Sequence, residues 1–170
     1  MKRHERQGKV KFWPSVFCIL LLVGCAPVIS RELRGQVAKE LTFHEVSKDP
    51  EAYAGKIVLW SGVILKSANL KEGTLIEVLQ KPADRRGRPL DVDESAGRFL
   101  ALYSGYLDVA IYSQEKEVTI AGEIKGKRVL PLGEIEYTYP LISIKEIYLW
   151  RPVREERIYP CFYWWWYYPY

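Results

Sequence analysis

The sequence predicts an all-β domain preceded by short helical turns. Five segments with strand-like apolar patterns follow one another, and no segment between them is long and periodic enough for an ordinary helix. Consecutive strands without intervening helices indicate an antiparallel sheet that closes, or nearly closes, into a barrel. The predicted strands span residues 56–65, 74–79, 98–103, 117–124 and 139–150.

Short helical turns are expected just before the first strand. Thr42 and Glu45 have the spacing of a capping box, so a helix should begin after Thr42. Asp49-Pro50 offers a second helix start, and Gly55 stands where that helix should stop.

Several positions refine the predicted sheet. Gly62 interrupts the first strand and marks a bend or a close backbone approach. Residues 81–97 are polar and rich in Pro and Gly, which is typical of a long loop. A turn is expected at 126–128, and a β-bulge near Lys145-Glu146, where the apolar alternation fails. A small OB-like antiparallel barrel fits this pattern best.

The N-terminus has the three zones of an export signal. A basic head precedes an apolar run over 12–23, and Gly24-Cys25 follows at once. The run is shorter than the roughly 20 apolar residues that a membrane-spanning helix needs, although an uncleaved anchor is the alternative. We expect a signal peptide over 1–24, a tether over 25–40, the barrel over 41–157 and an aromatic tail over 158–170.

The charge of the chain comes from its leader. Five of the 25 Lys and Arg residues and one of the 21 Asp and Glu residues precede Cys25, which leaves 20 of each in the remainder. Nucleic-acid-binding proteins usually carry a clustered basic face. The remainder has no basic excess to offer, so we expect no nucleic-acid partner.

Leu22, Val23, Gly24 and Cys25 resemble the lipobox of bacterial lipoproteins, and they stand where a lipobox belongs, at the end of an export signal. The resemblance implies cleavage before Cys25, a diacylglycerol on its sulfur and an acyl chain on its amino group. Two or more acyl chains hold a protein stably on a membrane. Ala26 follows rather than Asp, which favours the outer membrane, with the domain facing the periplasm. Cys161 would then be a lone thiol.

An ordered set of motifs between residues 42 and 150 resembles the Slp family of outer-membrane lipoproteins, the starvation-inducible type. The resemblance implies an acylated barrel associated with the outer membrane, and it indicates a location and a fold rather than a mechanism. The motifs are Gly55-Lys56, Trp60-Ser61-Gly62, Asn69, Gly73-Thr74, Ile76-Glu77-Val78-Leu79, Pro82, Gly87, Pro89, Asp93, Ser95-x-Gly97-Arg98-Phe99, Gly105-Tyr106-Leu107-Asp108, Tyr112, Gly122, Gly133-Glu134, Tyr137-x-Tyr139-Pro140 and Leu149-Trp150.

The residue sets that usually carry catalysis are missing from the sequence. His44 is the single histidine after the leader, and no nucleophile-elbow, phosphate-loop or dinucleotide motif accompanies it. One His and one free Cys cannot build a zinc site. The Asp91-x-Asp93-x-Ser95 triplet lacks the Gly and the Glu that a calcium loop needs. We expect neither an enzyme nor a metal site, and no cofactor besides the lipid.

Glu77, Arg98 and Glu134 are charged residues beside strand-like apolar residues. Buried charges are usually paired, so a structural ion pair that fixes the barrel register is one interpretation. A polar patch in a ligand groove on the barrel face is the other.

The C-terminal tail is dense in aromatic residues, with Trp164, Trp165 and Trp166 at its centre. Trp and Tyr favour membrane–water interfaces, which predicts a contact with the membrane surface or with a partner. A low-complexity tail without such a role is the alternative.

The sequence thus favours a lipid-anchored outer-membrane protein with a non-catalytic, accessory or interaction role, acting with an envelope protein partner. The alternative is a periplasmic module that binds a small molecule or glycan with the 81–97 loop and the strand face that bears Arg98. A nucleic-acid-binding OB domain and an enzyme are disfavoured, since fold alone does not license a function.

Overall fold

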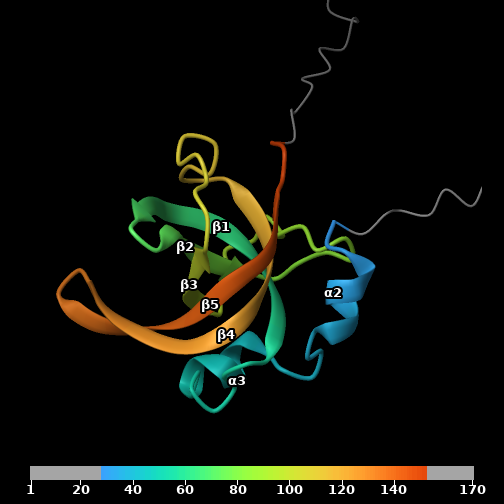
Figure 1. Ribbon diagram of the computed structural model, residues 1–170, viewed down its shortest axis with the longest axis horizontal. Helices are drawn as coiled ribbons and strands as arrows, with labels where there is room; N and C mark the ends of the chain where they lie inside the picture. Colours follow the sequence, from blue (N-terminus) through green and yellow to red (C-terminus); the bar gives the residue numbers. More distant parts are fainter. Residues whose placement is uncertain (1–27, 153–170) are drawn as a thin grey trace, which may run out of the picture.

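The computed structural model describes residues 28–152, which form a small barrel and two short helices (Figure 1). The five predicted strands are confirmed, and β1, β4 and β5 run further than expected. In chain order the elements are α2 (Arg31–Gln36), α3 (Phe43–Lys48), β1 (Ile57–Leu70), β2 (Gly73–Lys81), β3 (Gly97–Tyr103), β4 (Glu117–Leu132) and β5 (Ile135–Leu149). Neither of the described helices is long and apolar enough to cross a membrane.

The strands close into a ring in the order β1-β2-β3-β5-β4, which confirms the predicted OB-like barrel. One detail of the prediction is wrong, because β3 and β5 are parallel over the three pairs from Leu100↔Leu141 to Leu102↔Ser143. The other four neighbouring pairs are antiparallel. Strand directions cannot alternate throughout a ring with an odd number of strands, so one pair has to be parallel.

The core fills the barrel with alternate side chains from all five strands, as the period of two requires. An aromatic cluster lies at one end, where Phe43 of α3 packs on Trp60 with ring centroids 4.8 Å apart, and Trp60 packs on Phe99 at 5.1 Å. Helix α3 therefore closes that end of the barrel. The core residues that the five strands contribute to the barrel are Val58, Trp60, Ile64, Ile76, Val78, Phe99, Ala101, Val118, Ile120, Ile124, Ile142 and Ile144.

The predicted capping box holds the start of α3. Thr42 Oγ1 accepts a hydrogen bond from the Glu45 backbone N–H at 3.3 Å, and the Thr42 backbone N–H donates to Glu45 Oε2 at 2.8 Å. The hydrogen bond from the Thr42 backbone is the main reason that the pKa of Glu45 lies below its ordinary value. The second helix expected near Asp49-Pro50 is instead a run of turns, ended by Gly55 with φ +84°.

Part of the segment predicted as a tether is folded. Helix α2 lies within it, capped by the side chain of Ser30, and Val37 forms a parallel bridge with Ile57 of β1. Ile29 is only 1% exposed, and the Ser30 backbone N–H donates to Glu146 Oε2 of β5 at 2.8 Å. Residues 29–30 and 37–38, on either side of α2, therefore contact the barrel.

Two of the sequence-based refinements are confirmed. A Cβ on Gly62 would lie 2.1 Å from the carbonyl oxygen of Leu79, so Gly62 is a site of close backbone approach. The register of β4 against β5 passes from Ala121↔Glu146 to Gly122↔Ile144, which leaves Lys145 as the extra residue of a bulge.

The predicted turn at 126–128 is wrong. Gly126 stays in β4 with φ +111°, beside a second bulge that leaves Lys125 unpaired in the ladder, and the pairing with β5 continues to Leu132↔Ile135. The turn between β4 and β5 lies at Gly133-Glu134 instead. Gly, Lys and Arg in sequence look like a turn, but the bulge absorbs the unusual backbone at Gly126 without ending the strand.

Candidate functional site

Glu77 and Arg98 form an ion pair on the outer face of β2 and β3. Their neighbours Ile76, Val78 and Phe99 point into the core, so these two charged side chains point outward. Arg98 Nη1 lies 2.9 Å from Glu77 Oε1, and the two side chains are 33% and 20% exposed. Of the two interpretations of these residues, an observed contact supports the structural one, an ion pair across two strands.

Tyrosines of β5 complete this cluster beside the parallel seam. The Tyr139 hydroxyl donates to Glu77 Oε1 at 3.2 Å, and the Tyr137 hydroxyl accepts from the Arg98 backbone N–H at 3.1 Å. The hydrogen bond to Glu77 raises the pKa of Arg98, and burial, followed by the negative charge of Glu77, raises the pKa of Tyr139. The cluster thus ties three strands together, and the tyrosines were missed because nothing in their spacing points to Glu77.

Glu134 does not join the cluster. It lies exposed in the turn between β4 and β5, and none of the hydrogen bonds or ion pairs found among the described residues involves it. The strand that precedes it runs eight residues beyond the predicted end at residue 124, which carries Glu134 to the tip of the hairpin. The prediction of a three-residue charge cluster is thereby reduced to Glu77 and Arg98.

The loop between β2 and β3 folds over the outer face of β1 and β4, not over the face of Arg98. The carbonyl oxygen of Gly87 accepts hydrogen bonds from Ser61 Oγ at 2.6 Å and from Thr119 Oγ1 at 2.5 Å. Thr119 Oγ1 also accepts from Trp150 Nε1 at 2.9 Å. These hydrogen bonds fix the loop on the barrel.

Next to Gly87, the loop places Arg88 in a fixed position at the end of β5. Arg88 Nη2 lies 2.6 Å from Glu117 Oε2, and the Arg88 Nε–H donates to the same oxygen at 2.7 Å. The guanidinium carbon lies 5.5 Å from the ring centroid of Trp150, within cation–π range. The loop, the start of β4 and the end of β5 are thereby joined.

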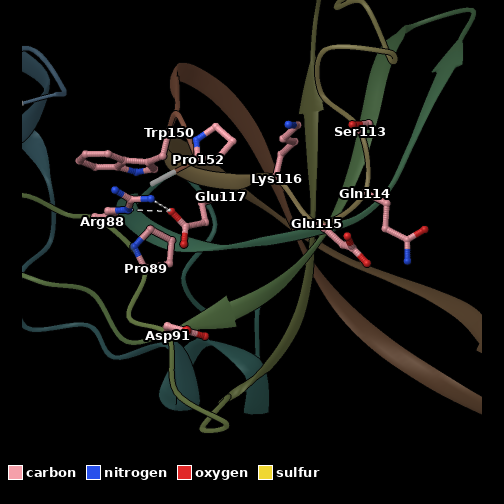
Figure 2. Close-up of a pocket in the computed structure, with 10 residues that line it drawn as sticks. All are labelled: Arg88, Pro89, Asp91, Ser113, Gln114, Glu115, Lys116, Glu117, Trp150 and Pro152. Carbon is pink, nitrogen blue, oxygen red and sulfur yellow. Dashed lines mark hydrogen bonds and ion pairs between the residues drawn. The ribbon is translucent and has the colours of Figure 1, made fainter. Parts of the chain in front are cut away.

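An open groove of about 800 Å³ lies beside this pair (Figure 2). Five of its ten lining residues are charged. The Arg88–Glu117 pair forms one wall, and Glu115 and Lys116 contribute from the turn that precedes β4. The lining residues are Arg88, Pro89, Asp91, Ser113, Gln114, Glu115, Lys116, Glu117, Trp150 and Pro152.

The backbone at Glu115 is held in an unusual conformation at the groove. Its φ of 69° lies in the left-handed region, and it is the single non-glycine residue with positive φ among residues 28–152. The Glu115 N–H donates to the Ile64 carbonyl at 2.9 Å, and the Ile64 N–H donates to the Lys116 carbonyl at 2.9 Å. These two bonds to β1 hold the strained turn and fix where the Glu115 and Lys116 side chains begin.

The remaining predicted site residues are placed as follows. His44 is exposed on α3, and no three His, Cys, Asp or Glu side chains within residues 28–152 are grouped as metal ligands. The lipobox residues Leu22, Val23 and Gly24, the lipidation residue Cys25, and Trp164, Trp165 and Trp166 of the tail lie outside the described residues.

Comparison with known proteins decides the family. The family model described as outer membrane lipoprotein Slp family matches residues 22–170. The chain belongs to that family. The outer membrane protein Slp of Escherichia coli (strain K12) is 29% identical over 133 residues, which cover 76% of this chain and 69% of the relative. An uncharacterized protein of Haemophilus influenzae is 24% identical over 145 residues, 85% of this chain and 78% of its own.

Solved structures give weak matches. A small single-stranded DNA-binding protein from Streptomyces coelicolor aligns with 12% identity and a TM-score of 0.32, over 56% of this chain and 94% of that one. Schizosaccharomyces pombe Pot1pC, solved with single-stranded DNA, aligns with 8% identity and a TM-score of 0.31, over 71% of this chain and 88% of that one. Scores this low carry no argument about what the Slp-family chain binds.

Membership of the Slp family confirms the resemblance inferred from the ordered motifs, and with it the outer-membrane location. That the protein is not an enzyme, has no cofactor besides the lipid and binds no nucleic acid remains a prediction.

Proposed function

We propose that this Slp-family protein is anchored by acyl chains on Cys25 and has a non-catalytic, accessory role in the envelope, where its barrel contacts an envelope protein from the periplasmic side. The observation that carries the proposal is the extent of the family match, which begins at Leu22, the first lipobox residue, and continues through the whole barrel. One family model thus covers both the segment that resembles a lipobox and the barrel.

The contacts of the barrel support a scaffold role. Its most prominent charged groups bind one another, as Glu77 does with Arg98 and Glu117 with Arg88. Charged groups paired in this way position strands and loops. A catalytic acid or base, by contrast, needs to be within hydrogen-bond reach of a substrate.

The test is the intact mass of the membrane-extracted protein beside a Cys25→Ser variant. We expect a mature chain that begins at Cys25 and carries acyl mass, and we expect the variant to keep its leader and lack that mass. A full-length chain without acyl mass would contradict the anchor.

The second candidate is a ligand-binding module, and the groove beside Arg88 and Trp150 is the observation that favours it. The expected 81–97 loop does contribute to this groove, through Arg88, Pro89 and Asp91, although Arg98 does not line it. Saturation-transfer NMR with small glycans would test this candidate, with loss of transfer expected in Trp150→Ala.

A further inference from the structure

Both ends of the described chain lie near Gly87, the residue before Arg88 of the groove. A Cβ placed on Gly87 would lie 4.0 Å from Val28 Cγ2 and 3.4 Å from Thr119 Cγ2. Thr119 in turn holds Trp150, and Pro152 lines the groove itself. Val28, at the start of the described chain, and Trp150, near its end, are therefore both close to Gly87 and Thr119.

The short chain between the barrel and Cys25 limits how far this side can stand from the membrane. Val28 is the third residue after Cys25, and a fully extended chain gains at most about 3.5 Å per residue, which gives a reach of about 10 Å. Because Ser30 and Ile29 are held against the barrel, an acyl-modified Cys25 would keep the groove side close to the lipid headgroups.

Exposed apolar side chains lie at the same end. The β3–β4 loop, which leads directly into the groove at Ser113, exposes Val109 by 39% and Ile111 by 54%. On β5, Tyr148 is 38% exposed and packs against Trp150 with centroids 4.8 Å apart. Exposed aliphatic side chains on a loop that leads into the groove, together with a Tyr–Trp pair at the end of β5, are suited to the boundary between acyl chains and headgroups.

The groove between these residues carries charges of both signs that are not used within the barrel. Lys116 is a cation, Asp91 and Glu115 are anions, and none of the three has an ion-pair partner among the described residues. A zwitterionic phospholipid headgroup offers the complement, since its phosphate suits an ammonium and its amine suits carboxylates.

We propose that the groove end of the barrel is a membrane-contacting surface, with the β3–β4 loop at the level of the upper acyl chains and the groove against zwitterionic headgroups. The inference rests on the proposed anchoring at Cys25 and adds the orientation of the barrel. The β4–β5 turn then points away from the membrane, because β5 separates Ile135 from Leu149 by up to about 45 Å.

The test is the depth of a nitroxide label on the lipidated protein in vesicles of phosphatidylethanolamine with a minority of phosphatidylglycerol. Ile111→Cys carries the label at the proposed contact, and Ile135→Cys is the matched control, an isoleucine with 62% exposure near the far turn. Both are made with Cys161→Ser, so that the label has one target. We expect label 111 to collide more often with oxygen than with a water-soluble nickel complex, and label 135 to show the reverse.

Flotation of the same samples separates the two proposals. Protein that floats with the vesicles while label 111 stays accessible to nickel would overturn the membrane-contacting surface and leave the anchor standing. Protein that neither floats nor carries acyl mass would overturn both. Val109→Cys provides a second label position on the loop if Ile111→Cys impairs folding, as judged by its thermal unfolding.

Discussion

Glu77 and Tyr139 stand 62 residues apart in sequence, yet the Tyr139 hydroxyl donates to the same Glu77 oxygen that accepts from Arg98. The contact links β2 to β5 across β3, next to the short parallel seam. A carboxylate oxygen that accepts from both a guanidinium and a phenol is a strong junction because both bonds are charge-assisted.

We expect the Glu77–Arg98 pair to contribute about 1 kcal/mol of coupling free energy, because it is partly shielded from water. A double-mutant cycle with Glu77→Gln and Arg98→Met, followed by denaturant unfolding of the purified protein, measures this coupling. The exposed pair between Glu51 and Lys127 is the control and should give close to zero. Equal coupling in the two cycles would contradict a structural role for Glu77 and Arg98.

We expect the protein to lose stability at alkaline pH in a way that depends on Tyr139. Burial and the charge of Glu77 raise the pKa of Tyr139 in the folded state. The stability that Tyr139 contributes is therefore fully present below its ordinary pKa of 10.0 and is lost as the pH rises above that value. Unfolding midpoints measured across this range should fall less steeply in Tyr139→Phe than in the wild type. Tyr106→Phe, at a site that is 68% exposed, should retain the wild-type slope.

We expect the protein to lose stability at acid pH in a way that depends on Glu123. Hydrogen bonds from Lys125, and then from Lys145, lower its pKa, so the stability it provides is present above the ordinary value of 4.5 and is lost as the pH falls. Each lysine is the extra residue of a bulge, one on β4 and one on β5. Glu123→Gln should flatten the acid limb of the stability curve. An unchanged limb would show that these exposed pairs contribute nothing measurable.

Gly62→Ala should destabilise the barrel by about 3 kcal/mol or more, because the new Cβ would lie 2.1 Å from a backbone oxygen that cannot move without breaking the sheet. Gly35→Ala is the matched control, since no atom lies within 4 Å of its Cβ position on α2. In that helix alanine should add about 0.5 kcal/mol of stability. Thermal unfolding of both variants tests this pair, and similar losses in both would refute the close approach at Gly62.

The parts of the fold that local chemistry decides could be predicted from the sequence. Alternating apolar residues located all five strands, the spacing of Thr42 and Glu45 located α3, and the failed alternation at Lys145 located a bulge. In each case the signal and the structure lie within a few residues of each other.

The parts that depend on distant segments could not be predicted. The hydrophobic period does not distinguish a strand that bulges at Lys125 from one that turns there, so β4 was cut short and Glu134 was placed in the wrong cluster. Helix α2 buries none of its own residues, so it left no apolar stripe to find.

The groove was also beyond the reach of the sequence. Arg88 and Glu117 are 29 residues apart. The loop that brings them together is held by the hydroxyls of Ser61 and Thr119, and in the sequence these two residues look like ordinary strand residues. Only the fold shows that Trp150 completes the same wall.

The parallel seam between β3 and β5 also has a consequence for the order of assembly. The β1–β2–β3 meander and the β4–β5 hairpin each pair neighbours in sequence, whereas closing the ring requires β4 to find β1 and β5 to find β3. Long loops must close before those contacts form, so we expect the two pieces to form first and to dock late. Native-state hydrogen exchange should then be faster for amides at the three-pair seam than within the long β4–β5 hairpin.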